Sequence, residues 1–380
     1  MDTNFQSSRY RKVAWLECDL GQSEFTPGGM VALNIILSPI FGPPFTHPTL
    51  PYCAHYVGST TPRSSPSLYL AAIQACMASY RLDIAFSEEL EEGANEVGLT
   101  PLVVNTMGWV KGLGADLGER ILEIVDPTSI FEVHPHIRNQ NHTDDSGRTH
   151  RIEGIPTSLL DTQFSGADWR VISIMSYFHA VFPHSPYSPP SPMVTTQQQT
   201  ATSWSTQLPL LAMPPFELEC SKTLDKVFLV GAGMEDVVEA EIGRVLNGAI
   251  IALVGCEPHS LDGDQSGKGG IPYTQGRNVI PPDVSKCLGL ALIRSISPTS
   301  SHMQILTPTP PSLLTQCRIL VKGELELPVW GMLDFREGDK VKDGSRGMTV
   351  GVPYLQWGRG EGVGGERRKI RRNLMRRGQM

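Results

Sequence analysis

The sequence lacks long hydrophobic runs and paired cysteines. Its longest apolar stretch, GAIIALVGC at 248–256, is far shorter than the ~18 residues that a membrane-spanning helix needs, so we expect no membrane partner. The first fifteen residues contain no apolar core typical of a secretion signal. Seven cysteines are scattered without a C-x-x-C pair, which argues against a disulfide framework and a zinc knuckle. We therefore expect a soluble protein of a reducing compartment.

The composition is that of a folded, loop-rich protein. Its 380 residues point to two or three domains, and 40% apolar against 19% charged residues is too hydrophobic for general disorder. Gly and Pro together make up 67 residues, well above the ordinary ~12%, which excludes a compact helical bundle. The net charge is −7, yet 367–377 hold seven Arg or Lys and no acid. An acidic body with a basic tail indicates a nuclear-type or RNA-contacting extension.

Strand-length apolar runs and amphipathic stretches alternate in the first half of the chain. The runs PLVVN (101–105) and SIFEV (129–133) enclose a helical pattern, which predicts a β-α-β crossover and a parallel sheet. Two further strands are expected at 13–16 and 30–36. Helices are expected at 65–86, starting at Ser65 and Pro66, and at 168–182.

Composition shifts divide the chain. Residues 183–215 are Pro-, Ser-, Thr- and Gln-rich and are typical of a linker. The β-like runs beyond it predict a mostly β domain. The expected order is a polar leader (1–12), an α/β domain (13–182) with a polar insertion (134–165), the linker (183–215), the β-rich domain (216–336) and a disordered basic tail (337–380). The β-like runs are 226–231, 248–255, 288–296, 302–308 and 317–330.

Three motifs that suggest ligand sites fail on their spacing. GAGMED (231–236) lacks the third glycine of a dinucleotide fingerprint and predicts a tight turn. GDQSGKGG (263–270) is one residue short of a phosphate loop, and Gly follows Lys268 where Ser or Thr is needed. His134, His136 and His142 have no Cys or paired acids beside them, so solvated histidines are the better interpretation.

One set of motifs is specific. VAWLECDLGQSEFTPGG (13–29) runs an apolar strand into an acid, which is how P-loop nucleotidases place a carboxylate beside magnesium and phosphate. GPPFTHPTLP (42–51), YVGSTTP (56–62) and PLVVNTMGWVKGLG (101–114) follow in order. Together they resemble the polynucleotide 5′-hydroxyl-kinase family. The nucleolar members that process pre-ribosomal RNA are more similar than the mRNA cleavage-factor and tRNA-splicing kinases. The resemblance continues at GADWRVISIMSYFH (166–179) and in the C-terminal part.

The resemblance implies a fold and an activity. The fold would be α/β, a partial P-loop NTPase-type parallel sheet with helices plus a mostly β C-terminal domain. The chain would be a transferase that moves the γ-phosphate of ATP, with Mg²⁺, to the 5′-OH of an RNA end during rRNA processing in the nucleus and nucleolus. A processing endonuclease is an implied partner. The alternative is a non-catalytic scaffold that binds RNA or a nuclease. A GTPase switch is disfavoured because the sequence has no N-K-x-D motif.

The acid-ended strand supplies the first candidate residues. By resemblance, Asp19 accepts the proton of the 5′-hydroxyl and helps to hold magnesium. Glu17 lies two residues back on the same strand face and is a second candidate near the metal, with a structural salt bridge as the alternative. Gln22, in the following turn, would position water, metal or phosphate.

Four more residues follow from the resemblance. Thr60 and Thr61 would bind phosphate through their hydroxyls, with turn capping as the alternative. Trp109 would stack on an RNA base, unless it is a core residue. Arg170 starts the helix where the family has a lid, and would balance charge on the transferring phosphoryl group; a surface arginine is the alternative.

One element of the family pattern is missing. The family carries a G-x-x-x-x-G-K-[ST] loop upstream of the acid-ended strand, but here only twelve residues precede Val13, and none of them forms this motif. Without the loop, no backbone N–H groups or lysine would hold the phosphates. We therefore expect a kinase chain without its N-terminal domain, first strand and phosphate loop, inactive by itself.

Overall fold

The computed structural model describes ten stretches of the chain. They are 10, 12–86, 99–134, 147–156, 163–183, 199–256, 270–276, 279–297, 302–327 and 329–332. Most of the leader, the basic tail, Lys268, His136 and His142 lie outside them. The chain divides into two compact units, 1–332 and 333–380, and every described residue belongs to the first. None of the helices in these stretches has the length and apolarity to cross a membrane.

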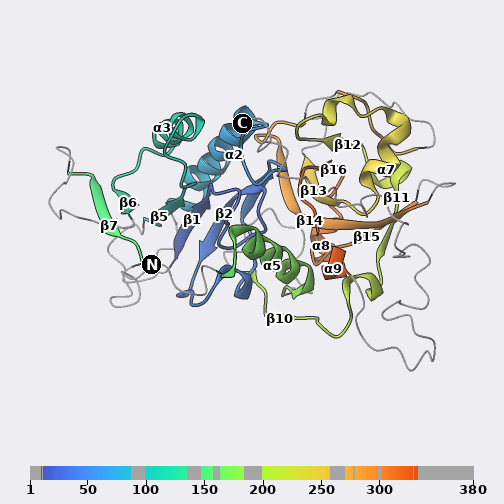
Figure 1. Cartoon of the computed structure of the whole chain (residues 1–380), viewed down its shortest axis with the longest axis horizontal. Coiled ribbons are helices and arrows are strands. Elements are labelled where there is room, and N and C mark those ends of the chain that lie inside the picture. The colour runs from blue at the N-terminus through green and yellow to red at the C-terminus, as the bar shows by residue number, and fades with distance from the viewer. Residues whose placement is uncertain are drawn as a thin grey trace, which may run out of the picture. The chain divides into compact units, whose positions relative to one another are not determined.

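A four-stranded mixed sheet forms the N-terminal half, in the order β4-β2-β1-β5 (Figure 1). β1 (Val13–Glu17) pairs in parallel with β5 (Leu102–Asn105) and antiparallel with β2 (Met30–Ile36), which pairs with β4 (Cys53–Tyr56). Glu17 is opposite Asn105, so the carboxyl ends of the two parallel strands meet at one edge. This is the edge at which open α/β sheets bind ligands.

The two faces of this sheet bury different neighbours. Side chains alternate along a strand, so Ala14 and Leu16 point to one face and Trp15 and Glu17 to the other. Ala14 and Leu16 belong to a core shared with α2 (Pro66–Ser79) and α3 (Leu113–Val125), and α2 continues into a π-helical turn, Tyr80–Ile84. Helix α2 starts at the predicted place, with Ser65 at the N-cap position and a proline in the first turn, although the Ser65 side chain makes no capping hydrogen bond.

The predicted β-α-β crossover over 101–133 is wrong. β6 (Ile130–His134) does not join β5 but pairs in parallel with β7 (Thr149–Glu153) in a separate two-stranded sheet. α3 ends at Asp126, whose left-handed φ of 49° turns the chain away. The apolar residues Phe131 and Val133 suggested a buried strand, but in β6 both side chains are exposed.

The predicted β-rich C-terminal region is confirmed as a six-stranded sheet, in the order β11-β15-β14-β13-β16-β12. Each of the five predicted runs overlaps one of its strands, whereas β11 was not predicted. The strands are β11 (Phe216–Glu219), β12 (Lys226–Leu229), β13 (Ile250–Cys256), β14 (Ser285–Ile296), β15 (His302–Leu306) and β16 (Ile319–Lys322). The short helices are α6 (Cys220–Thr223), α7 (Ile242–Leu246), α8 (Pro311–Leu314), α9 (Val329–Met332), η3 (Leu210–Ala212), η4 (Met234–Asp236) and η5 (Glu239–Glu241).

Helix α5 (Gly166–His179) joins the two sheets, and it covers most of the range predicted for it. Its buried residues Ile174, Tyr177 and Phe178 share one hydrophobic cluster with both sheets. The Tyr177 hydroxyl accepts a hydrogen bond from the Leu290 N–H at 2.8 Å. Both predicted domains therefore contribute to a common core, and their boundaries stay a prediction. Short pairings complete this region: β3 (Thr49–Leu50) with β9 (Gln199–Thr200), and β8 (Ala180–Val181) with β10 (Ser203–Trp204).

Candidate functional site

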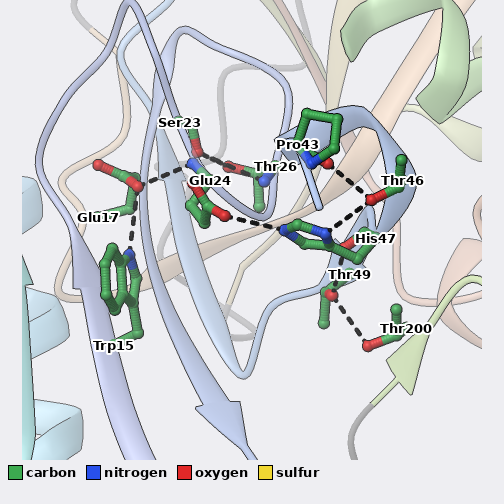
Figure 2. Close-up of polar contacts among 10 residues, drawn as sticks. All are labelled: Trp15, Glu17, Ser23, Glu24, Thr26, Pro43, Thr46, His47, Thr49 and Thr200. Carbon is green, nitrogen blue, oxygen red and sulfur yellow. Dashed lines mark hydrogen bonds and ion pairs between the residues drawn. The ribbon is translucent and has the colours of Figure 1, made fainter. Parts of the chain in front are cut away.

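Glu17 is the buried centre of the loop that follows β1. Its Oε1 accepts hydrogen bonds from the Asp19 N–H (3.0 Å) and the Asn105 side-chain amide (2.8 Å). Its Oε2 accepts from the Glu24 N–H (3.0 Å) and the Trp15 indole (3.3 Å), as Figure 2 shows for the latter two. Two donors from the loop, one from β1 and one from β5 converge on this carboxylate. They fix the loop to the edge of the sheet.

Burial dominates the electrostatics of Glu17. Removal from water disfavours the charged form and raises the pKa of this carboxyl to about 7, although the four hydrogen bonds favour the charged form and act in the opposite direction. Since both oxygens already accept two hydrogen bonds, a direct metal contact would displace one of these donors. The geometry gives Glu17 a positioning role, because it orients the backbone of Asp19.

One carboxylate oxygen of Asp19 is held by the loop and the other is open. The residue is half-buried, and its Oδ1 accepts hydrogen bonds from the N–H groups of Gly21 (2.8 Å) and Gln22 (3.0 Å). Among the residues that the structure describes, Oδ2 makes no hydrogen bond or ion pair. A carboxylate held through one oxygen and open at the other suits both proton acceptance and a magnesium contact.

Two glycines mark where the predicted residues converge. A Cβ at Gly21 would lie 3.3 Å from the Thr60 carbonyl oxygen, 3.4 Å from Asp19 Oδ1 and 3.9 Å from Arg170 Nη1. A Cβ at Gly166 would lie 2.7 Å from the Gln22 side-chain amide and 3.7 Å from Arg170 Nη1. Asp19, Gln22, the Thr60 backbone and Arg170 therefore share one site, although they lie up to 151 positions apart in the sequence.

The loop after β4 leaves its threonine hydroxyls available. Ser59, which is buried, accepts the N–H of Thr61 on its hydroxyl at 3.4 Å, so Ser59 performs the turn capping that was the alternative role for Thr60 and Thr61. Neither threonine hydroxyl hydrogen-bonds to another described residue. The loop itself is anchored, because the Gly58 carbonyl accepts the Glu324 N–H at 2.6 Å.

Trp109 contacts the loop that carries Thr60 and Thr61. It is half-buried and belongs to none of the hydrophobic core clusters among the described residues, and the guanidinium of Arg63, in that loop, lies 4.8 Å from its ring centroid. Among the described residues, no hydrogen bond or ring contact joins Trp109 to Asp19, Gln22 or Arg170. A partly exposed indole beside a cation can stack on a base, and its role stays a prediction.

One wall of the site, formed by Phe45 and Trp169, was not predicted from the sequence. A pocket of about 340 Å³ lies beside the Asp19 loop and is lined by Gln22, Glu24, Phe45, Trp169 and Arg170, among others. The Phe45 and Trp169 rings stack with centroids 6.0 Å apart. Phe45 lies within η1 (Pro44–Thr46), in a motif that carried the family resemblance without an assigned role.

A hydrogen bond between the buried His47 and the half-buried Glu24 supports that wall. His47 Nε2 lies 3.1 Å from Glu24 Oε1, and His47 Nδ1 lies 3.2 Å from the Thr46 hydroxyl (Figure 2). Because Glu24 also donates its N–H to Glu17, this pair connects η1 to the loop that carries Asp19. The sequence does not predict this contact, because Glu24 and His47 are far apart along the chain and only the fold brings them together.

Comparisons with known proteins find similar chains in one family. Residues 3–180 match a family described as mRNA cleavage and polyadenylation factor CLP1 P-loop. The chain is 38% identical, over 97% of its length and 53% of the relative, to polynucleotide 5′-hydroxyl-kinase GRC3 of Cryptococcus neoformans var. neoformans serotype D. It is 26% identical, over 99% of its length and 52% of the relative, to grc3 of Schizosaccharomyces pombe. The chain thus spans about half the length of these relatives.

Solved structures establish the fold independently. Two structures of Clp1p with Pcf11p match with TM-scores of 0.51 and 0.50 at 16% identity, and each match covers 86% of this chain. They cover 70% and 69% of the solved chains. The expected fold class, a P-loop NTPase-type α/β part with a sheet-rich C-terminal part, is confirmed.

Proposed function

We propose, from the similarity to the polynucleotide 5′-hydroxyl-kinases, that the chain contributes the Asp19 site at which such an enzyme phosphorylates RNA. The substrate would be an RNA with a free 5′-hydroxyl, and ATP would donate the phosphoryl group. The observation that carries this proposal is the convergence of Asp19, the Thr60 loop and Arg170 around Gly21 at the carboxyl edge of the sheet.

The geometry suggests a division of roles. The free Oδ2 of Asp19 accepts the proton of the RNA 5′-hydroxyl, and Asp19 would hold Mg²⁺ through one of the waters that this ion keeps, so that Oδ2 stays open to the proton. The oxygen of the 5′-hydroxyl bonds to the γ-phosphorus, and the bond from that phosphorus to the ADP oxygen breaks. Arg170 Nη1 lies near Asp19 and balances the charge that spreads over the phosphoryl oxygens. Thr60 and Thr61 donate hydroxyl hydrogen bonds to the phosphate. Glu17 keeps Asp19 oriented.

Magnesium fits one of the two predicted ligands. Asp19 offers an oxygen that makes no contact with the described residues, whereas both Glu17 oxygens are occupied by N–H donors. Mg²⁺ usually takes one or two carboxylates and substrate phosphates, so Asp19 would hold it, and the ion would neutralise phosphate charge. The 380 residues contain no G-x-x-x-x-G-K-[ST] motif, so the cradle for the ATP phosphates is not assigned to any residue of this chain.

The biological setting is also part of the proposal. The resemblance to the nucleolar kinases supports a role in rRNA processing in the nucleus and nucleolus, with a processing endonuclease as partner. The competing function is a scaffold that binds RNA or a nuclease without catalysis, and the missing phosphate-loop motif favours it for the 380-residue chain taken alone. Transfer of labelled phosphate from ATP to 5′-OH RNA, with and without a supplied phosphate loop, separates the two.

Replacing Trp109 with alanine should weaken binding of a short single-stranded RNA by about 10- to 100-fold, because stacking on one base contributes ~1–3 kcal/mol. Fluorescence anisotropy with labelled RNA measures this loss. Trp109→Phe should bind nearly as well as the unchanged chain, since a phenyl ring also stacks. A Trp109→Ala protein that no longer melts cooperatively would show instead that the indole is needed for folding.

Replacing Arg170 with alanine, in a version with a phosphate loop, should lower turnover by about 10²–10³-fold with little change in RNA affinity. The guanidinium charge is needed mainly in the transition state, so kcat falls while binding is kept. Single-turnover kinetics measure the effect, with Arg244→Ala, an exposed arginine on α7, as the matched control. Equal turnover in Arg170→Ala and Arg244→Ala would place Arg170 outside the chemistry.

A further inference from the structure

Three potential metal ligands meet on the opposite face of the N-terminal sheet. Cys53 and His55 lie two residues apart on β4 and so point to the same face, where Cys76 of α2 packs against them. All three are buried, with exposed fractions of 3%, 5% and 0%. Cys53 Sγ lies 3.4 Å from His55 Nε2, and the three donor atoms all lie within 4.8 Å of one another. No part of the kinase proposal uses this cluster.

The spacing fits a single ion. Zinc binds at ~2.3 Å from sulfur and ~2.0–2.1 Å from imidazole nitrogen, so in a tetrahedral site two sulfurs lie about 3.8 Å apart and a sulfur and a nitrogen about 3.5 Å apart. The Cys53–His55 separation of 3.4 Å matches the second value. The 4.8 Å within which all three donor atoms lie exceeds these values by about 1 Å, which rotation of the side chains removes. The backbone of β4 and α2 can therefore stay in place.

Thiophilic metal ions bind the thiolate form of cysteine, so each cysteine that binds the ion gives up its thiol proton.

We propose that Cys53, His55 and Cys76 bind one thiophilic ion, Zn²⁺ in preference to Cu⁺. Two thiolates and a neutral imidazole around Zn²⁺ give a complex without net charge, which has a lower burial cost than the anionic Cu⁺ complex. The three side chains leave the fourth position of a tetrahedral zinc for a water or another donor. Binding releases the thiol protons and ties β4 to α2, the elements on either side of the Thr60 loop.

The test uses the full chain and metal alone. The protein, reduced and stripped with a chelator, is titrated with Zn²⁺ and separately with Cu⁺ against a coloured competing chelator. We expect one Zn²⁺ per chain, at least a 100-fold loss of affinity in Cys53→Ser and Cys76→Ser, and unchanged binding in Cys220→Ser. Cys220, the first residue of α6, is an equally buried cysteine in the C-terminal part and serves as the matched control.

A second measurement separates binding from folding. Each stripped variant is melted with and without Zn²⁺, and the Tm of the unchanged chain and of Cys220→Ser should rise with zinc concentration. A Cys53→Ser protein that melts cooperatively but shows no rise supports the site. The proposal fails if the unchanged chain binds no ion, binds Cu⁺ only, or forms a Cys53–Cys76 disulfide in place of the metal. It also fails if both serine variants keep full zinc affinity. None of these readouts depends on kinase activity.

Discussion

Replacing Asp19 with asparagine, in a version of the chain supplied with a phosphate loop, should lower RNA phosphorylation by about 10²–10⁴-fold, the usual contribution of a positioned general base. Asparagine keeps the size of the side chain and, through its oxygen, the hydrogen bonds from the Gly21 and Gln22 N–H groups. The asparagine amide nitrogen, which replaces Oδ2, cannot take the proton of the 5′-hydroxyl, and asparagine holds Mg²⁺ more weakly than aspartate. Transfer of labelled γ-phosphate to a 5′-OH RNA measures the loss.

Two comparisons complete this experiment. The 380-residue chain without an added loop should transfer no phosphate above background, because positioning and charge stabilisation supply most of the rate in phosphoryl transfer. Asp116→Asn, at an exposed position in the first turn of α3, should be fully active. Full activity of Asp19→Asn would remove this residue from the mechanism. Activity of the chain by itself would mean that phosphate binds elsewhere, with Lys268 as the first residue to examine.

Replacing Glu17 with alanine should lower the free energy of unfolding by about 3–5 kcal/mol. Its carboxylate accepts four hydrogen bonds inside the protein, and each buried donor left without an acceptor costs ~1–3 kcal/mol before the loop relaxes. Urea unfolding followed by tryptophan fluorescence measures the change. Asp19→Ala, two residues away and half-buried, should cost less than about 1.5 kcal/mol, and equal losses would contradict the central position of Glu17.

The same residue predicts a pH dependence. The folded state raises the pKa of Glu17 from 4.5 to about 7, so between these values the folded protein binds more protons than the unfolded chain. Its contribution to stability is therefore present at low pH and is lost as the pH rises from about 4.5 to 7. The difference in unfolding free energy between the unchanged chain and Glu17→Gln should shift across this window. A constant difference would show that burial does not control this carboxyl.

Local signals in the sequence predicted the elements well. The Ser65–Pro66 start of α2 depends on neighbouring residues, and the structure has this helix and also the helix expected at 168–182, as α5. The strand before Asp19 was equally clear, because a run of apolar residues ended in acids. The family motifs placed Asp19, Gln22, Thr60 and Arg170 in one site, which the fold brings together.

Long-range pairings were not predictable in the same way. The run 129–133 has the composition of a strand, but its partner is decided by how α3 ends, and it pairs with β7 in a separate sheet. The role of Glu17 depends on Asn105, which is 88 positions away. The Cys53–His55–Cys76 cluster has no sequence spacing typical of a metal site, because a strand and a helix supply its members.

The anchoring of α5 has a consequence for how the site operates in time. Trp169 stacks on Phe45 near the start of the helix, and Tyr177 accepts a hydrogen bond from the C-terminal sheet near its end. A helix held at both ends cannot swing as a rigid lid without opening the shared core, a motion of microseconds to milliseconds. Arg170 can instead reach a phosphoryl group by rotating its own side chain, within picoseconds to nanoseconds. The arginine would then be in place before each encounter, and its arrival would not limit the rate.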